Sequence, residues 1–404
     1  MAEPTGRQWR RTSTSGLIAA LAAAMVVFSS CTTATRLSTT ATTSGRPPTS
    51  PATVAPTSTG TTEPVTTTTF PASFGVGIRT ITLVDTTRPT ENYATAPPSM
   101  LSPHRVIATQ IRYPTLSRAP GVEQTGATPA SGFGPFPVIV FAHGYAVMPN
   151  TYEYLLDAWV RAGFVVVSPV FPVSNYYEWL RQGGGPAPEA DMGNEPADVA
   201  FVVGQLAKLA GQTGSFLHGL IDLQRLGLAG QSDGATIVGG LVYAGYWRGY
   251  FASMPVHPLA VALLSGAAFQ TAGAYAVPTP SRPAVLSVES DTDYCNPTAN
   301  ATELYSSVAP GARQHWFMTL EGADHLGPYV GQLPWAPAVA TVTTDFFALE
   351  LEARGRNVTA ATVGRAGDVH GVSSITGAAS VTLPSTSDDY DCGSPTPYDP
   401  YPGG

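Results

Sequence analysis

The sequence predicts an α/β fold with a mostly parallel central sheet and helices on both faces of that sheet. Short apolar runs rich in Val, Leu, Ala and Phe recur between residues 137 and 320, and glycine or proline bounds many of them. Segments long enough for helices separate these runs. Continuous apolar strands are typical of parallel sheets buried on both faces, and their alternation with helices favours the same architecture.

The expected elements follow this alternation along the chain. Two β-rich stretches come first, at 78–84 and 106–113, where β-branched residues are frequent. The core strands are then expected at 137–142, 164–170, 226–229, 259–264, 284–288 and 315–320. Helices are expected between them, at about 151–162, 196–210, 234–246, 299–308 and 335–353.

The composition supports one sizeable core and excludes nucleic acid as a partner. The chain has 404 residues, of which 43% are hydrophobic and 12% charged, and its formal net charge is −8. Such a chain has enough apolar material for a large domain. Nucleic-acid binding needs a dense Lys/Arg surface that displaces counterions from phosphates, and this acidic balance provides none.

The N-terminus, residues 1–31, is interpreted as a signal peptide. Arg7, Arg10 and Arg11 form a positively charged start, and residues 17–28 form an apolar run that is too short to span a bilayer. Small residues and then Cys31 follow, which resembles a bacterial lipobox whose cysteine is lipidated. We therefore expect an exported protein, anchored by lipid to the outer face of a bacterial membrane. The alternative is an ordinary secretory signal and a secreted protein.

Three regions are expected after the signal. Residues 32–73 are rich in Thr, Ser and Pro and predict a disordered linker, because they contain too little apolar surface to offset the entropy of ordering. A catalytic domain is expected over 74–356 and a mostly irregular tail over 357–404. The acidic run Asp388, Asp389 and Asp391 in that tail is interpreted as solvated charge, with a calcium site as the alternative.

Two cysteines remain for the exported part of the chain. Cys295 and Cys392 are expected to form one disulfide, since thiols oxidise outside the cytoplasm. The bond would close a loop of about a hundred residues and stabilise the fold by about 4 kcal/mol. Two unpaired thiols are the alternative.

The most informative segment is a G-x-S-x-G motif that runs from Gly230 through Ser232 to Gly234. An apolar strand precedes it and a helix of small residues follows at once. This context is that of a nucleophile elbow, in which a tight strand-to-helix turn projects the serine hydroxyl out of the sheet. Ser232 is therefore the candidate nucleophile.

A serine hydroxyl needs a general base that a third group orients. His325 follows the strand at 315–320, where a base would be presented, so it is preferred over His257, His315 and His370.

The acid is expected in the loop after the strand at 284–288, which contains Glu289, Asp291 and Asp293. Asp293 is preferred because Pro297 follows it in an Asp-x-x-x-Pro pattern, and Asp291 stays open as the alternative.

Backbone N–H groups would stabilise the negative charge that develops when a serine attacks a carbonyl. The donors are expected to be those of Tyr145, in the loop after the first core strand, and of Asp233, the residue after the nucleophile. We expect the Asp233 carboxylate to point away from the oxyanion or to find a partner. His143 precedes the serine and is interpreted as a structural histidine.

These motifs together resemble the α/β-hydrolase superfamily. His143-Gly-Tyr145, Gly230-Gln-Ser-Asp-Gly234 and Gly322-Ala-Asp-His325 look like dienelactone hydrolase, chlorophyllase and bacterial cutinase-like esterases. Asp85-Thr-Thr-Arg88 and Asn194-Glu-Pro-x-Asp198 look like secreted bacterial relatives of platelet-activating-factor acetylhydrolase.

The resemblance covers about residues 75–354. It implies the α/β-hydrolase fold and carboxylic-ester hydrolysis through an acyl-enzyme, with a Ser-His-Asp triad and without metal or organic cofactor.

The resemblance does not specify which ester is the substrate. Polyester-degrading relatives carry a hydrophobic residue where this chain has Asp233, and a Trp where it has the stretch that begins at Ser265, so a polyesterase is not favoured. The ester could be a small molecule, a lipid or a polymer. A serine peptidase or acyltransferase is the alternative enzyme. A catalytically silent, cell-wall-facing binding lipoprotein is the alternative outside catalysis.

Overall fold

The computed structural model describes residues 70–117, 121–185, 187–268, 275 and 282–386. The predicted signal peptide, the lipidation site Cys31, almost all of the linker, Cys392 and the acidic run at 388–391 lie outside the described residues. Among the described residues, no helix combines the length and the apolar composition needed to cross a bilayer.

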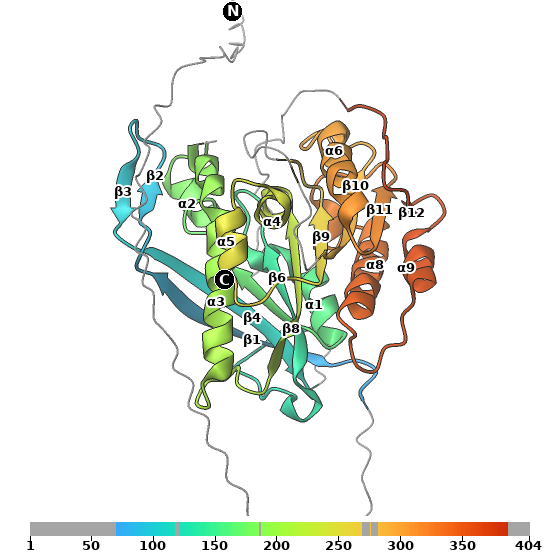
Figure 1. Cartoon of the computed structure of the whole chain (residues 1–404), viewed down its shortest axis with the longest axis horizontal. Helices are drawn as coiled ribbons and strands as arrows, with labels where there is room; N and C mark the ends of the chain where they lie inside the picture. Colours follow the sequence, from blue (N-terminus) through green and yellow to red (C-terminus); the bar gives the residue numbers. More distant parts are fainter. Residues whose placement is uncertain (1–69, 118–120, 186, 269–274, 276–281, 387–404) are drawn as a thin grey trace, which may run out of the picture. The chain divides into compact units, whose positions relative to one another are not determined.

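The central sheet of the described part contains ten strands (Figure 1). These are β1 (Gly75–Asp85), β4 (Arg105–Thr115), β5 (Gln124–Thr125), β6 (Phe136–Ala142), β7 (Val165–Pro169), β8 (Ile221–Gln231), β9 (Ala260–Leu264), β10 (Ala284–Ser290), β11 (His315–Leu320) and β12 (Ser373–Thr376). Their spatial order is β12-β11-β10-β9-β8-β6-β7-β4-β1-β5. The block from β7 to β11 is parallel throughout, and β4 and β12 pair antiparallel with its two edges.

Helices connect and cover these strands. They are α1 (Glu153–Arg161), α2 (Tyr176–Arg181), α3 (Glu195–Gly211), α4 (Asp233–Tyr243), α5 (Arg248–Ser253), α6 (Thr298–Val308), α7 (Gly327–Val330), α8 (Trp335–Glu350) and α9 (Ala360–Gly367). Short 3-10 helices occur at Ser131–Phe133, Pro149–Tyr152, Ala187–Gly193 and Ala309–Gly311, and a small hairpin joins β2 (Thr90–Asn92) to β3 (Ser99–Ser102).

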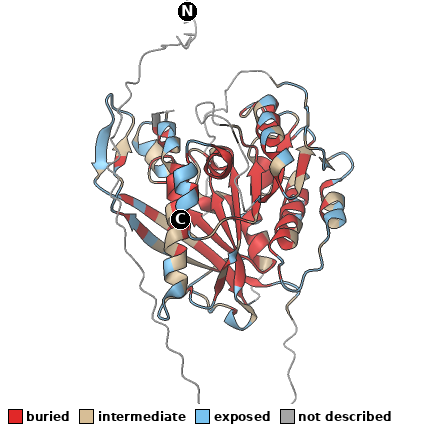
Figure 2. Cartoon of the chain, viewed as in Figure 1, coloured by how far each residue is buried: buried red, intermediate tan, exposed pale blue. Residues whose placement is uncertain are grey.

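Successive residues of the core strands point into two hydrophobic cores, one on each face of the sheet. In β6, Val138 and Val140 pack in the core that contains apolar residues of α3, α4 and α6. Ile139 and Phe141 pack in the opposite core, with α1 and α8. Every residue of β6 is buried, as a strand covered on both faces must be, and Figure 2 shows this buried centre beneath partly exposed helices. The predicted α/β class, with a mostly parallel sheet covered on both faces, is confirmed.

The region that was expected to be a mostly irregular tail contains a helix and a strand. Within the described part of 357–404, α9 packs against α8, and β12 extends the sheet by pairing with β11. Both elements are short, and neither has the long apolar run by which the core elements were predicted.

A buried group of charges joins the first strands to α3. We call Arg88, Arg105, Asp191 and Asp198, together with Asp85, the arginine cluster. Arg105 Nε lies 2.8 Å from Asp198 Oδ1, and Arg105 Nη2 lies 2.8 Å from Asp191 Oδ2. Arg88 reaches both Asp85, at 2.7 Å, and Asp198, at 2.6 Å. The motifs around Asp85 and Asp198 therefore meet in space and fix β1 and β4 to α3.

Candidate active site

Ser232 lies at the turn between β8 and α4, with backbone angles of φ 57° and ψ −125°. A positive φ is strained for a residue with a side chain and marks a site where the surrounding structure enforces the conformation. The Ser232 N–H donates to the carbonyl of Leu264, at 2.9 Å, and this anchors the turn to the end of β9. The strand, strained serine and helix have the geometry expected of a nucleophile elbow.

Both glycines of the motif are required by close packing. A Cβ added to Gly230 would lie 2.2 Å from backbone atoms of Gly234. A Cβ added to Gly234 would lie 2.1 Å from the carbonyl oxygen of Ala142, at the end of β6. These distances are far below van der Waals contact, so the turn can form only with glycine at both positions.

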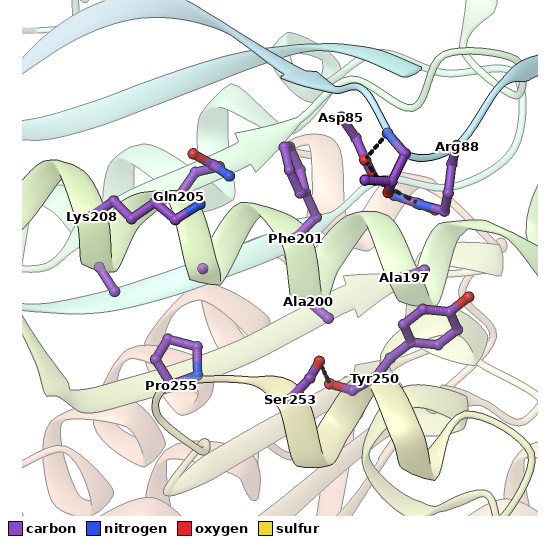
Figure 3. Close-up of a pocket in the computed structure, with 13 residues that line it drawn as sticks. Asp85, Arg88, Ala197, Ala200, Phe201, Gln205, Lys208, Tyr250, Ser253 and Pro255 are labelled. Carbon is purple, nitrogen blue, oxygen red and sulfur yellow. Dashed lines mark hydrogen bonds and ion pairs between the residues drawn. The ribbon is translucent and has the colours of Figure 1, made fainter. Parts of the chain in front are cut away.

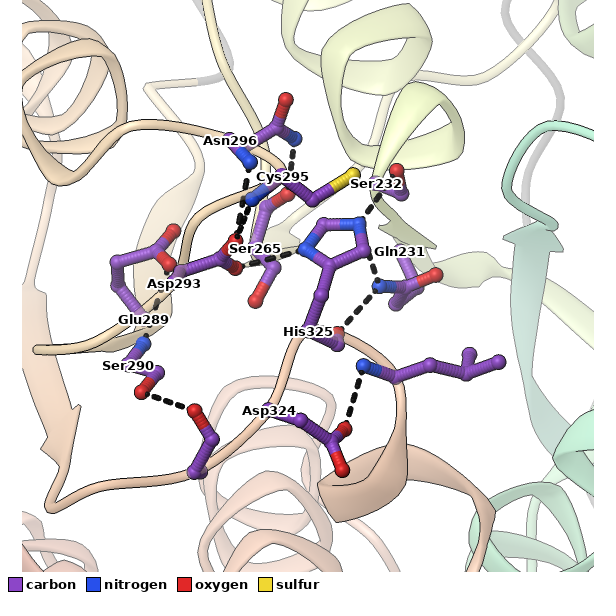
Figure 4. Close-up of polar contacts among 12 residues, drawn as sticks. Gln231, Ser232, Ser265, Glu289, Ser290, Asp293, Cys295, Asn296, Asp324 and His325 are labelled. Carbon is purple, nitrogen blue, oxygen red and sulfur yellow. Dashed lines mark hydrogen bonds and ion pairs between the residues drawn. The ribbon is translucent and has the colours of Figure 1, made fainter. Parts of the chain in front are cut away.

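The structure brings Ser232, His325 and Asp293 together in one chain of hydrogen bonds (Figure 4). His325 Nε2 lies 2.8 Å from Ser232 Oγ, and His325 Nδ1 lies 2.7 Å from Asp293 Oδ2. Asp293 is fully buried, whereas the His325 side chain is 13% exposed. The carboxylate orients the ring, and the far nitrogen of that ring is in place to accept the serine proton.

Asp293 is held as a carboxylate in spite of its burial. Burial acts to raise its pKa, but hydrogen bonds from His325, Glu289 and the backbone of Asn296 outweigh this effect and hold the pKa below its usual value. Its Oδ1 accepts the N–H groups of Cys295, at 2.8 Å, and of Asn296, at 2.9 Å. A charged acid is what a His325 imidazolium would need beside it.

The alternative acid lies elsewhere. Asp291 accepts the N–H of Gly322 at 2.8 Å, so it connects two loops and does not contact His325. The other downstream histidines also lie apart from Ser232. His257 contacts the carbonyl of Phe251, His315 begins β11, and His370 is exposed.

The expected oxyanion donors flank the serine. Among the described residues, neither the Tyr145 N–H nor the Asp233 N–H has a hydrogen-bond partner. Asp233 is the first residue of α4, where the N–H groups are free and the helix dipole favours negative charge. Both donors are therefore available to an incoming oxygen.

The Asp233 side chain was expected to point away from the oxyanion or to find a partner. Its Oδ2 is buried without a hydrogen-bond partner among the described residues. Burial, with a smaller effect of Glu189, raises the pKa of Asp233 well above its usual value. The raised pKa favours the neutral acid, and a neutral acid does not repel an oxyanion as a carboxylate would.

His143 has the structural position expected of it. Its Nδ1–H donates to the carbonyl of Gly144 at 2.8 Å, and its Nε2 accepts the N–H of Phe171 at 3.1 Å. Complete burial lowers its pKa to about 4, so the ring stays neutral. It thus connects the loop after β6 to the loop after β7.

A second set of contacts was missed by reasoning from the sequence. The Gly144 N–H donates to Tyr152 Oη at 3.1 Å, and Tyr152 donates in turn to Gln231 Oε1 at 2.8 Å. Gln231 Nε2 then donates to the backbone carbonyl of His325 at 3.0 Å. This chain of contacts ties the loop after β6 to the loop after β11 through Gln231, which precedes Ser232 at a variable position of the G-x-S-x-G motif.

The segment after β7 packs against the oxyanion loop. Ser174 accepts the N–H of Ala146 at 2.8 Å, and Tyr145 Oη donates to the carbonyl of Gly185 at 2.5 Å. The short helix α2 lies in this segment, and in it Tyr176 stacks on Trp179. These aromatic side chains thus belong to the segment that borders the candidate site.

The predicted disulfide remains a prediction. Cys295 is buried beside Asp293, and its expected partner Cys392 lies outside the described residues. A bond to that residue would hold the chain end to the loop that carries the acid.

One group of carboxylates among the described residues has spacing that could suit a metal ion, namely Glu123, Glu153 and Asp157. Arg112 pairs with Glu123, and Arg161 pairs with Asp157 at 3.0 Å. We interpret this group as an ion-pair cluster, because arginines already neutralise two of its three members.

A groove of about 770 Å³ lies elsewhere on the surface, beside α3 and α5 (Figure 3). Its lining includes Arg88, Phe201, Lys208 and Tyr250, and none of its lining residues belongs to the triad or to the expected oxyanion donors.

No family model matches this chain, and no curated protein matches it. Among solved structures, it is similar to a ferulic acid esterase from Streptomyces cinnamoneus, with 19% sequence identity and a TM-score of 0.49. That alignment covers 72% of this chain and 95% of the other. We therefore infer function from the geometry of the site.

Proposed function

We propose that this protein is a serine hydrolase that cleaves carboxylic esters through an acyl-enzyme. The observation that carries the proposal is the unbroken chain from Ser232 through His325 to Asp293, with both hydrogen bonds shorter than 3 Å. The strained elbow supports it, because such a backbone serves to present a nucleophile.

In the proposed reaction, His325 Nε2 takes the proton of Ser232 as Oγ attacks the ester carbonyl carbon. The N–H groups of Tyr145 and Asp233 stabilise the oxyanion that forms. The leaving alkoxide then takes the proton from His325, which leaves the acyl group on Ser232. Water, deprotonated by His325, releases the acid and restores the enzyme. These steps use only groups of the chain and need neither metal nor organic cofactor.

The test is turnover of p-nitrophenyl esters, from acetate to palmitate, by the purified protein and by Ser232→Ala. We expect turnover that the substitution abolishes, and the chain-length profile distinguishes an esterase from a lipase. An unchanged rate in Ser232→Ala would refute the assignment of the nucleophile. Turnover of peptide amides in preference to esters would favour the peptidase alternative, and the absence of any acyl transfer would favour the binding lipoprotein.

We further propose that the enzyme is exported and held at the outer face of a bacterial membrane through a lipid on Cys31. The apolar run at 17–28 followed by small residues and this cysteine supports the proposal. Cys31→Ser is expected to move the protein from the membrane fraction to the medium. An unchanged distribution in that variant would indicate that export occurs without lipidation.

A further inference from the structure

Glu289 is a buried carboxyl that the proposed reaction does not use. It lies near the end of β10, one residue before the loop that carries Asp293, and it has no exposed surface. Its Oε1 accepts the N–H of Ser290 at 3.1 Å. Its Oε2 is buried without a hydrogen-bond partner among the described residues, as expected of a carboxyl oxygen that faces another carboxyl group and no donor. Figure 4 shows the two carboxyl groups side by side.

Two adjacent buried carboxyls share one negative charge, because both cannot ionise together in a medium of low dielectric. The negative charge is more stable on Asp293, because Asp293 accepts hydrogen bonds from two backbone N–H groups and from His325. Glu289 accepts one backbone N–H. The proton of the pair therefore belongs to Glu289, and burial together with the charge of Asp293 raises the pKa of Glu289 well above its usual value.

Among the described residues, two groups face this pair. From α7, the buried Tyr329 hydroxyl lies 2.9 Å from Ser265 Oγ and near both carboxyl groups. From the loop after β11, His325 contacts Asp293. We identify no cation other than a protonated His325 that would favour ionisation of Glu289 among these contacts.

We propose that Glu289 is a positioning residue for the catalytic acid, donating its carboxyl proton to Asp293 and so fixing the direction and the basicity of that carboxylate. The proposal rests on the proposed function, because Asp293 matters only if His325 acts as the base. Glu289 itself touches no reacting atom.

The expected consequence is a pH effect. A carboxylate that loses a donor becomes more basic, and a more basic Asp293 holds the proton on His325 up to a higher pH. His325 must be unprotonated to act on Ser232, so the acid limb of kcat/KM would move to higher pH.

The test compares Glu289→Gln with Glu289→Leu. A glutamine oxygen can still accept the Ser290 N–H and its NH₂ group can still donate to Asp293, whereas leucine can do neither. We expect the acid limb of the Gln variant to match the parent. We expect that of the Leu variant to move up by about one pH unit, with kcat/KM on that limb about tenfold lower. Glu289→Met serves in the same way if the Leu variant does not fold.

A second readout does not depend on turnover. The His325 Nδ1 proton, which is bonded to Asp293, should give a downfield NMR signal that shifts in the Leu or Met variant and stays in place in the Gln variant. The proposal is overturned if folded apolar variants keep both the parental acid limb and the parental signal, or if Gln is as impaired as Leu. A parent enzyme without ester turnover would refute the proposed function, while the NMR comparison would still test the Glu289 contact.

Discussion

Two buried clusters of carboxylates in this molecule differ in the basic side chain that contacts them, which is arginine in one cluster and histidine in the other. In the arginine cluster, Arg105 is 1% exposed and contacts Asp191 and Asp198, which are fully buried. In the triad, Asp293 is also fully buried, but its partner is His325, whose imidazole ring can carry or give up a proton. In the first cluster the guanidinium groups keep their charge, and the ion pairs join strands to a helix. The second can gain and release a proton, and it lies next to a serine.

The largest effect should come from removing the charge of the triad acid. Asp293→Asn leaves the shape of the side chain but no longer holds His325 in the productive tautomer or stabilises its imidazolium. We expect kcat to fall about 10³- to 10⁴-fold, with little change in melting temperature. The measurement is steady-state ester hydrolysis together with thermal unfolding.

The matched control for that variant is Asp291→Asn, two residues away in the same loop. It should keep most of the activity, because Asp291 contacts Gly322 and not His325. A loss of activity confined to Asp291→Asn would transfer the role of the acid to that residue.

In contrast to the triad acid, a substitution in the arginine cluster should lower stability and leave activity unchanged. Asp198→Asn leaves Arg105 and Arg88 without one of their carboxylate partners, and we expect the free energy of unfolding to fall by about 3 kcal/mol. Folded protein should retain its kcat. Denaturant unfolding measures the loss, with Asp222→Asn as the control.

Asp222 pairs with Arg225 at 2.8 Å, but both side chains are partly exposed. That surface pair should contribute less than about 1 kcal/mol. Equal losses in the two variants would contradict the distinction between the buried cluster and a surface pair.

Asp233 extends the comparison, because it is a buried acid for which the described residues supply no cationic partner. Its pKa is raised, so the folded state holds the proton at pH values where the unfolded state has lost it. Stability should therefore fall as the pH rises from the unfolded pKa, about 3.9, through the folded one. Ionisation beside the oxyanion should also lower kcat at alkaline pH.

Asp233→Asn cannot ionise. It should lose less stability across that pH range and should exceed the parent in kcat by about tenfold at the alkaline end. Thermal unfolding and kcat measured across the same pH series check both statements. Parallel profiles for the two proteins would show that Asp233 does not titrate at the site.

The core of the site was predictable from the sequence because each of its residues follows a recognisable strand. Ser232 lies in a motif whose glycines are required by contacts below 3 Å, and His325 follows β11. Gln231 and Tyr152 were not predicted as site residues, and Glu289 was considered only as a candidate for the acid. Their contacts depend on the register of separate strands and loops, which no local pattern encodes. The added strand β12 was missed for a related reason, since four residues carry too little periodicity.

The smallest effect is expected at Tyr152, which connects the oxyanion loop to Gln231. Tyr152→Phe removes an acceptor for the Gly144 N–H and a donor to Gln231. We expect kcat to fall about fivefold, which corresponds to about 1 kcal/mol, with KM nearly unchanged. Tyr154→Phe is the control, because that side chain is exposed, at 43%. Indistinguishable kinetics in the two variants would show that the hydrogen bonds of Tyr152 do not contribute to catalysis.

The most direct test of the central claim is to trap the acyl-enzyme. The purified protein is mixed with a slowly released p-nitrophenyl ester, quenched in acid, digested and analysed by peptide mass spectrometry. We predict that the peptide containing Ser232 carries the mass of the acyl group, and that the adduct is absent from Ser232→Ala. An adduct on another residue, or ester turnover without any adduct on Ser232, would contradict the account.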